Sequence, residues 1–130
     1  MVGNLLRILV IDDNRDAADM LVSIFELHGH TAQAAYGGAQ GIAAAVIFAP
    51  DIIFLDIGMP EMDGYQVAAK LRCAPLPQRP FLIAFTAWDD AVSKARTAAA
   101  GFDLHLTKTA SLEALLVAVQ AAPTGLNQPG

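Results

Sequence analysis

Four short runs of apolar residues constrain the fold of this 130-residue chain more than any other feature. The runs are residues 8–11, 52–55, 81–85 and 104–106. A run that is apolar throughout, such as residues 52–55, is typical of a parallel strand covered by helices on both sides. Side chains with a carboxylate, a hydroxyl or an ammonium group follow the runs directly or closely: Asp12, Asp13, Asp56, Thr86 and Lys108. Because the carboxyl ends of parallel strands meet at one edge of a sheet, the sequence predicts that these groups gather there.

The segments between the runs carry the signals of helices. In the first segment, Asn14 is the expected N-cap and Gly29 the expected C-terminal end. Further helices are predicted at residues 39–48, 64–73 and 89–100 and from residue 112 onward, and a further strand at residues 31–35. Strands and helices that alternate in this way predict an α/β fold with a doubly wound, five-stranded parallel sheet.

The first and last helices have clear apolar stripes. The stripe of the first helix is expected at Ala18, Leu21, Phe25 and His28, and that of the last, capped by Ser111, at Leu112, Leu115, Leu116 and Val119. The last helix has further apolar residues at Ala114, Val117, Ala118 and Ala121. We expect this second apolar face to dock on a neighbouring chain or on another region of the same polypeptide.

Composition excludes several classes of function. A net charge of -5 with only 8 Lys and Arg residues argues against direct binding of nucleic acid, which needs clustered positive charge. Cys73 is the only cysteine, so an internal disulfide is excluded. The first apolar run is too short to span a membrane, and we expect a cytoplasmic protein without membrane contact. The three histidines, His28, His30 and His105, lack the spacing of metal ligands.

Four sequence blocks, taken together and in order, resemble the receiver domains of response regulators in two-component signalling. The blocks are VIDDN at residues 10–14, LDIGMPEMDG at 55–64, AFTA at 84–87, and GFD at 101–103 leading to LTK at 106–108. The resemblance covers residue 7 to about residue 121. It implies a flavodoxin-like (βα)5 fold with strand order 2-1-3-4-5, and we expect a receiver domain at residues 1–122 and a linker or disordered tail at 123–130.

The resemblance assigns a Mg²⁺ ion and a phosphoryl acceptor to the acidic residues. Carboxylates and carbonyl oxygens suit Mg²⁺, and Asp13, Asp56 and the Gly58 carbonyl are the expected ligands, with Asp12 acting through water. Asp56 is the expected nucleophile, which becomes an aspartyl phosphate. Any catalysis is then limited to the domain's own phosphorylation and dephosphorylation.

The remaining site residues are expected to contact the phosphoryl group. Lys108 would pair with one oxygen, the Thr86 hydroxyl would donate to another, and the small side chain of Ala87 would leave its backbone N–H within reach. Asp12, Asp13 and Thr86 could each be an ordinary helix cap or turn residue, but four such blocks in order favour the functional interpretation.

Two positions near the fifth strand depart from the family pattern. Thr109 stands where relatives usually have a proline joined through a cis bond, and a cis bond before a residue other than proline costs ~2.5–4 kcal/mol. We therefore predict a trans Lys108–Thr109 bond, a shifted loop and an uncertain reach for Lys108. His105 stands where the family has an aromatic residue that moves inward together with the threonine. An inward His105 needs a hydrogen-bond partner, and the alternative that it stays at the surface is equally open.

Gly58 and Trp88 occupy positions that, in this family, tune the access of water to the phosphoaspartate. Gly58 has no side chain that could orient water, whereas Trp88 could shield the site. We therefore expect that the phosphorylated form is not unusually short-lived, and that Trp88, the only tryptophan, reports on Mg²⁺ binding.

The expected phosphodonor is a phosphohistidine on a sensor histidine kinase or a histidine phosphotransfer domain. The residues 14–16, 101–103 and His105 look most similar to receivers of hybrid sensor kinases, so a further domain of the same polypeptide is a possible partner. Three alternatives stay open: a degenerate receiver that binds partners without phosphorylation, a Mg²⁺-dependent phosphatase with an aspartyl nucleophile, and a flavin-binding domain of the same winding.

Overall fold

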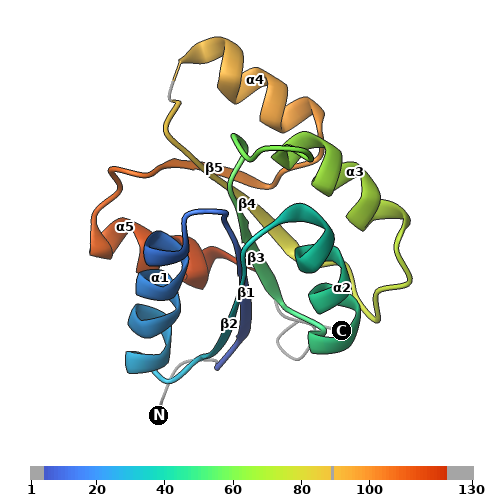
Figure 1. Cartoon of the computed structure of the whole chain (residues 1–130). Coiled ribbons are helices and arrows are strands. Elements are labelled where there is room, and N and C mark those ends of the chain that lie inside the picture. Colours follow the sequence, from blue (N-terminus) through green and yellow to red (C-terminus); the bar gives the residue numbers. More distant parts are fainter. Residues whose placement is uncertain (1–4, 89, 123–130) are drawn as a thin grey trace, which may run out of the picture.

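Strands and helices alternate along the whole of the structure, a computed structural model that describes residues 5–88 and 90–122. The elements, in chain order, are β1 (Arg7–Ile11), α1 (Arg15–Leu27), β2 (Thr31–Ala35), α2 (Gly38–Phe48), β3 (Ile52–Leu55), α3 (Gly64–Cys73), β4 (Phe81–Thr86), α4 (Ala91–Ala99), β5 (Leu104–Thr107) and α5 (Leu112–Ala121) (Figure 1). The expected tail at 123–130 and Asp89, expected in the fourth helix, lie outside the described residues.

The strands form one parallel sheet in the order β2-β1-β3-β4-β5, which confirms the predicted fold class. Ile11, the last residue of β1, pairs with Leu55, the last residue of β3. Asp12 and Asp56, which follow these two residues, therefore lie side by side at the carboxyl edge of the sheet. Strands β4 and β5 each run one residue further than predicted, because Thr86 pairs with Thr107. This extra pair brings Lys108 to the same edge.

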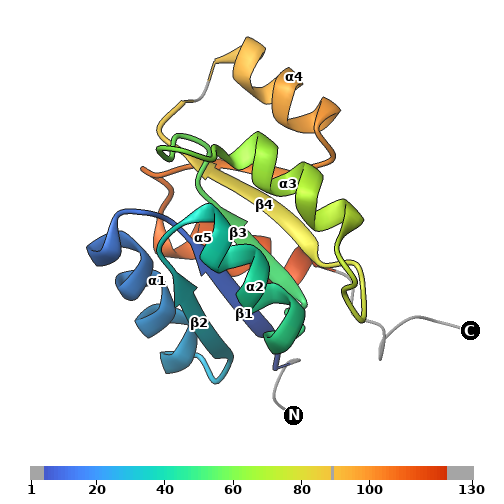
Figure 2. The same ribbon diagram turned by 45° about the vertical axis from the view of Figure 1, so that its right-hand side comes forward.

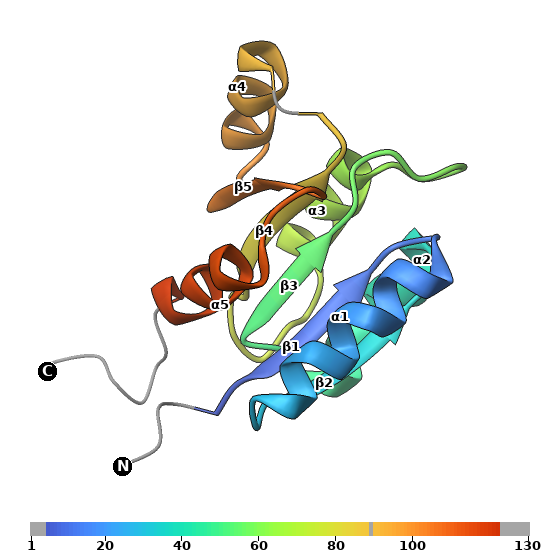
Figure 3. The same cartoon turned by 90° about the vertical axis from the view of Figure 1, so that its left-hand side faces the viewer.

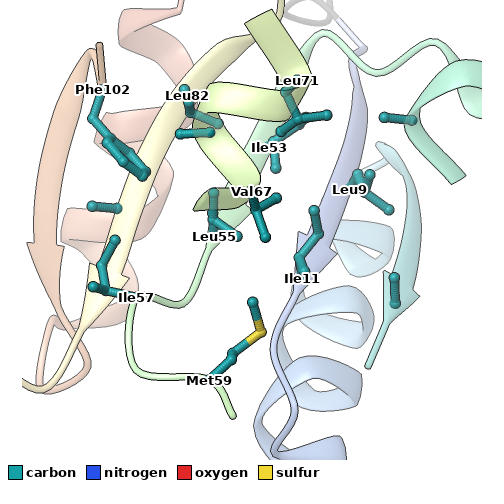
Figure 4. Close-up of a cluster of buried hydrophobic side chains, with 14 of the residues drawn as sticks. Leu9, Ile11, Ile53, Leu55, Ile57, Met59, Val67, Leu71, Leu82 and Phe102 are labelled. Atoms are coloured by element: carbon teal, nitrogen blue, oxygen red, sulfur yellow. The ribbon is translucent and has the colours of Figure 1, made fainter. Parts of the chain in front are cut away.

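Each face of the sheet carries its own apolar core. Helices α2 and α3 cover one face (Figure 2), and α1 and α5 cover the other (Figure 3). The first core contains Leu9, Ile53, Leu55, Val67 and Leu71, with Phe102 at its edge (Figure 4). In the second core, Phe54 contacts two rings: Phe25 in a tilted arrangement at a centroid distance of 5.1 Å, and Phe85 edge-to-face at 6.1 Å. Strands that are apolar on both faces, as predicted, are what two such cores require.

Two details of the predicted helices were wrong. His28 lies outside the buried stripe of α1: it is the exposed C-cap residue, and Gly29, with φ of 92°, follows it. In α5, Leu112 is 50% exposed, whereas Ala118 is buried in the second core. The apolar surface that α5 leaves exposed therefore centres on Leu112 and Val117 and does not include Ala118.

Helix α4 differs from the other helices in how it is packed. It stands apart from the sheet in all three views (Figures 1 to 3), and Thr97 is its only buried residue. Among the described residues, no helix combines the length and the apolar character needed to cross a membrane.

Candidate functional site

The three predicted acidic residues lie together at the carboxyl edge of the sheet. Carboxylate oxygens of Asp12, Asp13 and Asp56 all lie within 4.8 Å of one another. Asp12 and Asp56 are buried, and Asp13 is exposed. The backbone N–H of Asp56 donates to the Ile11 carbonyl at 2.9 Å, so the ladder between β1 and β3 fixes the spacing of the two buried carboxylates.

Local hydrogen bonds let the chain turn into α1 after Asp12 while the Asp12 carboxylate stays at the site. Oxygen Oδ1 of Asp12 accepts from the backbone N–H of Asn14 at 2.9 Å, and the Asn14 side chain caps α1 by accepting from the Ala17 N–H at 3.1 Å. The helix-cap and functional interpretations of this segment are therefore compatible: Asn14 forms the cap, and Asp12 remains directed to the site.

Lys108 joins the acidic residues across the sheet. Its Nζ lies 2.8 Å from Oδ2 of Asp12 and 3.4 Å from Oδ2 of Asp56. The described residues contain no cis peptide bond, so the Lys108–Thr109 bond is trans, as predicted. The lysine reaches the site nevertheless, because its backbone N–H donates to the Thr86 carbonyl at 2.8 Å and holds it to the end of β4.

The three carboxylates make the site electronegative, and the ammonium group of Lys108 compensates part of this charge. Burial raises the pKa of Asp56 to about 6, with a further increase from the charge of Asp12, and Lys108 opposes the rise only in part. Burial lowers the pKa of Lys108, but the hydrogen bond to Asp12 and the charges of Asp56 and Asp12 outweigh it, so that this pKa is raised overall. Three clustered carboxylates with one ammonium group fit a divalent cation of the Mg²⁺ type.

Glycines shape the loop between β3 and α3. A Cβ on Gly64 would lie 2.7 Å from the carbonyl oxygen of Asp56, so only glycine permits this close approach of α3 to Asp56. The N–H of Gly58 donates to Oδ1 of Asp56 at 3.3 Å. The Asp63 side chain and Gln66 form a capping box that starts α3.

The loop after β4 carries the predicted hydroxyl. Thr86 is 1% exposed, and its Oγ1 accepts from the Trp88 N–H at 3.3 Å. Ala87 is exposed beside it. Trp88 leans over Gly58: a Cβ on Gly58 would lie 2.9 Å from Cη2 of the indole. The indole thus occupies the room that a side chain at position 58 would need.

His105 is half-buried and has a hydrogen-bond partner at each ring nitrogen. Its Nδ1 lies 3.0 Å from Oγ1 of Thr97, and its Nε2 lies 2.8 Å from the Trp88 carbonyl. Sequence reasoning missed Thr97, since a single threonine among alanines has no motif. The one available signal was the absence of an apolar stripe in this helix, which indicates that something other than apolar contact holds it.

Sequence reasoning also missed a cavity beside the acidic residues. It has a volume of about 270 Å³ and opens next to Asp13, between the start of α2 and the loop after β3. Its lining residues are Asp13, Tyr36, Gly37, Gly38, Ala39, Gln40, Met59, Pro60, Glu61 and Met62.

The other two histidines and Cys73 lie elsewhere: Nδ1 of His30 accepts from the Leu6 N–H at 3.0 Å, and Cys73 is exposed.

Comparisons with known proteins agree with this geometry. The family model of the response regulator receiver domain matches residues 8–120. The chain is 34% identical over 119 residues to the DNA-binding dual master transcriptional regulator RpaA of Synechocystis sp., covering 88% of this chain and 48% of that protein. It is 32% identical over 118 residues to the response regulator MprA of Mycobacterium ulcerans, covering 89% of this chain and 49% of that protein. The chain thus spans about half the length of these curated relatives.

Solved structures give the same result for the fold. The chemotaxis protein CheY4 of Vibrio cholerae superposes with a TM-score of 0.85 at 22% identity, over 92% of this chain and 100% of that one. The receiver domain of the Francisella response regulator 1452 superposes with a TM-score of 0.79 at 27% identity, over 88% of this chain and 93% of that one. On the family match and the curated relatives, the chain belongs to the response regulator receiver domain family.

Proposed function

We propose that this receiver domain accepts a phosphoryl group on Asp56 from a phosphohistidine. One observation carries the proposal: the buried Asp56 carboxylate lies with Asp12 and Asp13 in a cluster whose oxygens are within 4.8 Å of one another, with Nζ of Lys108 at 3.4 Å. A carboxylate oxygen of Asp56 attacks phosphorus, a P–O bond forms, and the P–N bond to the donor imidazole breaks with its electron pair going to nitrogen.

The metal site of the proposal consists of Asp13, Asp56 and the Gly58 carbonyl, with Asp12 acting through water. A bound Mg²⁺ neutralises charge on the transferring phosphoryl group. The raised pKa of Asp56, about 6, supports this assignment, because the acceptor needs a neighbouring cation to be fully ionised near neutral pH.

Lys108, Thr86 and Ala87 complete the site. The ammonium group of Lys108 is paired with Asp12 and Asp56, and it would exchange one of these ion pairs for a contact with a phosphoryl oxygen. The Thr86 hydroxyl would donate to a second oxygen, and the exposed Ala87 would offer its backbone N–H. Thr86 and His105 form the proposed switch, in which the Thr86 hydroxyl turns from the Trp88 N–H to the phosphoryl group while His105 keeps its hydrogen bond to the Trp88 carbonyl.

The packing of Trp88 against Gly58 supports a phosphoryl group that is not unusually short-lived. The indole covers the position from which a side chain at residue 58 would orient water. Trp88 is 51% exposed, so the cover is partial.

The proposed donor is a sensor histidine kinase or a histidine phosphotransfer domain, and the proposed location is the cytoplasm. The relatives compared above are named as response regulators or transcriptional regulators, so the greater likeness to hybrid-kinase receivers stays a prediction. Among the alternatives, the degenerate receiver was suggested mainly by Thr109. Lys108 reaches both buried carboxylates despite Thr109, so this argument for a degenerate receiver no longer applies.

Intact mass after incubation with acetyl phosphate and Mg²⁺ tests the proposal. We expect a mass increase of one phosphoryl group, which is absent in Asp56→Asn and absent when EDTA replaces Mg²⁺. Asp13→Asn, which changes an exposed ligand only, should slow the uptake of label. Labelling of Asp56→Asn at the wild-type rate would contradict the assignment of the acceptor, and no labelling of the folded wild type by any phosphodonor would favour the degenerate receiver.

A further inference from the structure

A polar residue anchors α4, unlike the other helices, which bury apolar side chains. Thr97 is 2% exposed, and every other described residue of α4 is exposed or half-buried. Further contacts of the helix with the rest of the chain include a stacking of Arg96 on the Tyr65 ring at 4.0 Å and the Phe102 N–H donating to the Thr97 carbonyl at 3.1 Å. The burial of Thr97 therefore serves the hydrogen bonds of its hydroxyl and not the packing of an apolar core.

The hydroxyl of Thr97 fixes the ring of His105 from one side. Because the Trp88 carbonyl can only accept, Nε2 of His105 carries a proton and donates to it at 2.8 Å. At Nδ1, the ring either accepts from the Thr97 hydroxyl at 3.0 Å or, as an imidazolium, donates to it while the hydroxyl donates to the Lys94 carbonyl at 2.9 Å. The hydrogen bonds between Thr97 and His105 and between His105 and Trp88 are therefore both made, whether the imidazole is neutral or an imidazolium.

Trp88 connects this hydrogen-bond chain to the acceptor site at two points. Its N–H donates to Oγ1 of Thr86 at 3.3 Å, and its indole packs over Gly58, whose own N–H donates to Oδ1 of Asp56. Its carbonyl is the point at which His105 holds it. The position of the indole over Gly58 thus depends on a hydrogen bond from β5, which in turn depends on a hydroxyl from α4.

We propose that Thr97 is a positioning residue for phosphoryl retention: its hydroxyl orients His105, which holds the Trp88 carbonyl and keeps the indole over Gly58, whose N–H binds Asp56. This inference rests on the proposed function, in that the retained group is the phosphoryl group on Asp56. Loss of the hydroxyl frees the imidazole to rotate, and the loop after β4 then opens the site to water. One lost hydrogen bond of ordinary strength shifts such an equilibrium by about three- to tenfold.

The test compares Thr97→Val, which keeps the shape and removes the hydroxyl, with Thr97→Ser, which keeps the hydroxyl. Two quantities are measured in the full chain: quenching of Trp88 fluorescence by acrylamide without phosphodonor, and the decay of label after loading with acetyl phosphate and Mg²⁺. In Thr97→Val we expect stronger quenching and a decay about three- to tenfold faster than in the wild type, and in Thr97→Ser values near the wild type.

A second variant separates positioning from general loosening of the fold. His105→Phe should change both quantities in the same direction as Thr97→Val, and the double variant should add nothing further, because both residues act through one chain of hydrogen bonds. If Thr97→Val does not fold, His105→Phe alone decides, and wild-type behaviour in it overturns the inference. Equal effects of Thr97→Val and Thr97→Ser, or full additivity, also overturn it. Failure of the wild type to take up label overturns the proposed function instead, while the quenching measurement still tests the hydrogen-bond chain.

Discussion

Single residues in this protein act through their charge state more than through their size. Asp56 is the clearest case, because its burial and the neighbouring carboxylate of Asp12 both raise its pKa. Folding raises its pKa from 3.8 to about 6, so the folded chain binds a proton more tightly than the unfolded chain. The resulting contribution to the free energy of unfolding is fully present below pH 3.8 and is lost as the pH rises through about 6.

Asp56→Asn is therefore expected to stabilise the metal-free protein at alkaline pH. The neutral amide does not suffer the burial of charge, and the gain in the free energy of unfolding at about pH 8 should be about 1–2 kcal/mol after allowance for solvent screening. The gain should shrink as the pH falls through about 6. Urea unfolding of both proteins in EDTA at several pH values measures it. A difference between the two proteins that does not vary with pH would contradict the raised pKa of Asp56.

At the scale of elements, the connection between β3 and α3 decides where the acceptor lies. Gly64 lies so close to the Asp56 carbonyl that an added Cβ would meet backbone atoms at 2.7 Å, whereas a Cβ on Gly58 would meet only the Trp88 indole. The two glycines share one loop but differ in what surrounds them. They form a matched pair for substitution.

Gly64→Ala should destabilise the fold by about 1–3 kcal/mol and slow phosphorylation, because backbone must shift under Asp56. Gly58→Ala should change the free energy of unfolding by about 0.5 kcal/mol or less, since the indole can swing away. It should nevertheless alter the emission of Trp88. Chemical unfolding, fluorescence and labelling by acetyl phosphate measure these effects, and equal destabilisation by both substitutions would show that the close approach at Gly64 is not the cause.

For the whole molecule, a cation bound at the proposed site would link this site to the stability of the fold. A ligand that binds only the folded state raises the free energy of unfolding by about 2.7 kcal/mol at a hundred times its dissociation constant. Mg²⁺ should therefore raise the melting temperature in a concentration-dependent way. Asp13→Asn should abolish most of the increase while leaving the metal-free melting temperature unchanged, because Asp13 is exposed. A Mg²⁺ response that is identical in wild type and Asp13→Asn would remove Asp13 from the metal site.

The sequence by itself determined the order of elements, the parallel sheet and the residues at its carboxyl edge. Asp12, Asp13, Asp56, Thr86 and Lys108 were predictable because each follows an apolar strand, and parallel strands end at the same edge. The trans bond at Thr109 was equally predictable, because the penalty for a cis bond is local. The burial of Ala118 instead of Leu112 was not, since both lie on apolar faces of one helix and only the position of α5 against the sheet selects between them.

The tertiary structure alone decided the contacts between residues that are distant in sequence and carry no motif. The reach of Lys108 to Asp12 depends on the register of β4 and β5, and the partners of His105 depend on how α4 lies against β5. Local preferences of the chain fix strands, helices and caps, whereas hydrogen bonds such as that of Thr97 form only once packing has brought two separate elements within 3.0 Å. For that reason the sequence identifies the residues of the proposed acceptor site, and only the structure shows the contacts that surround them.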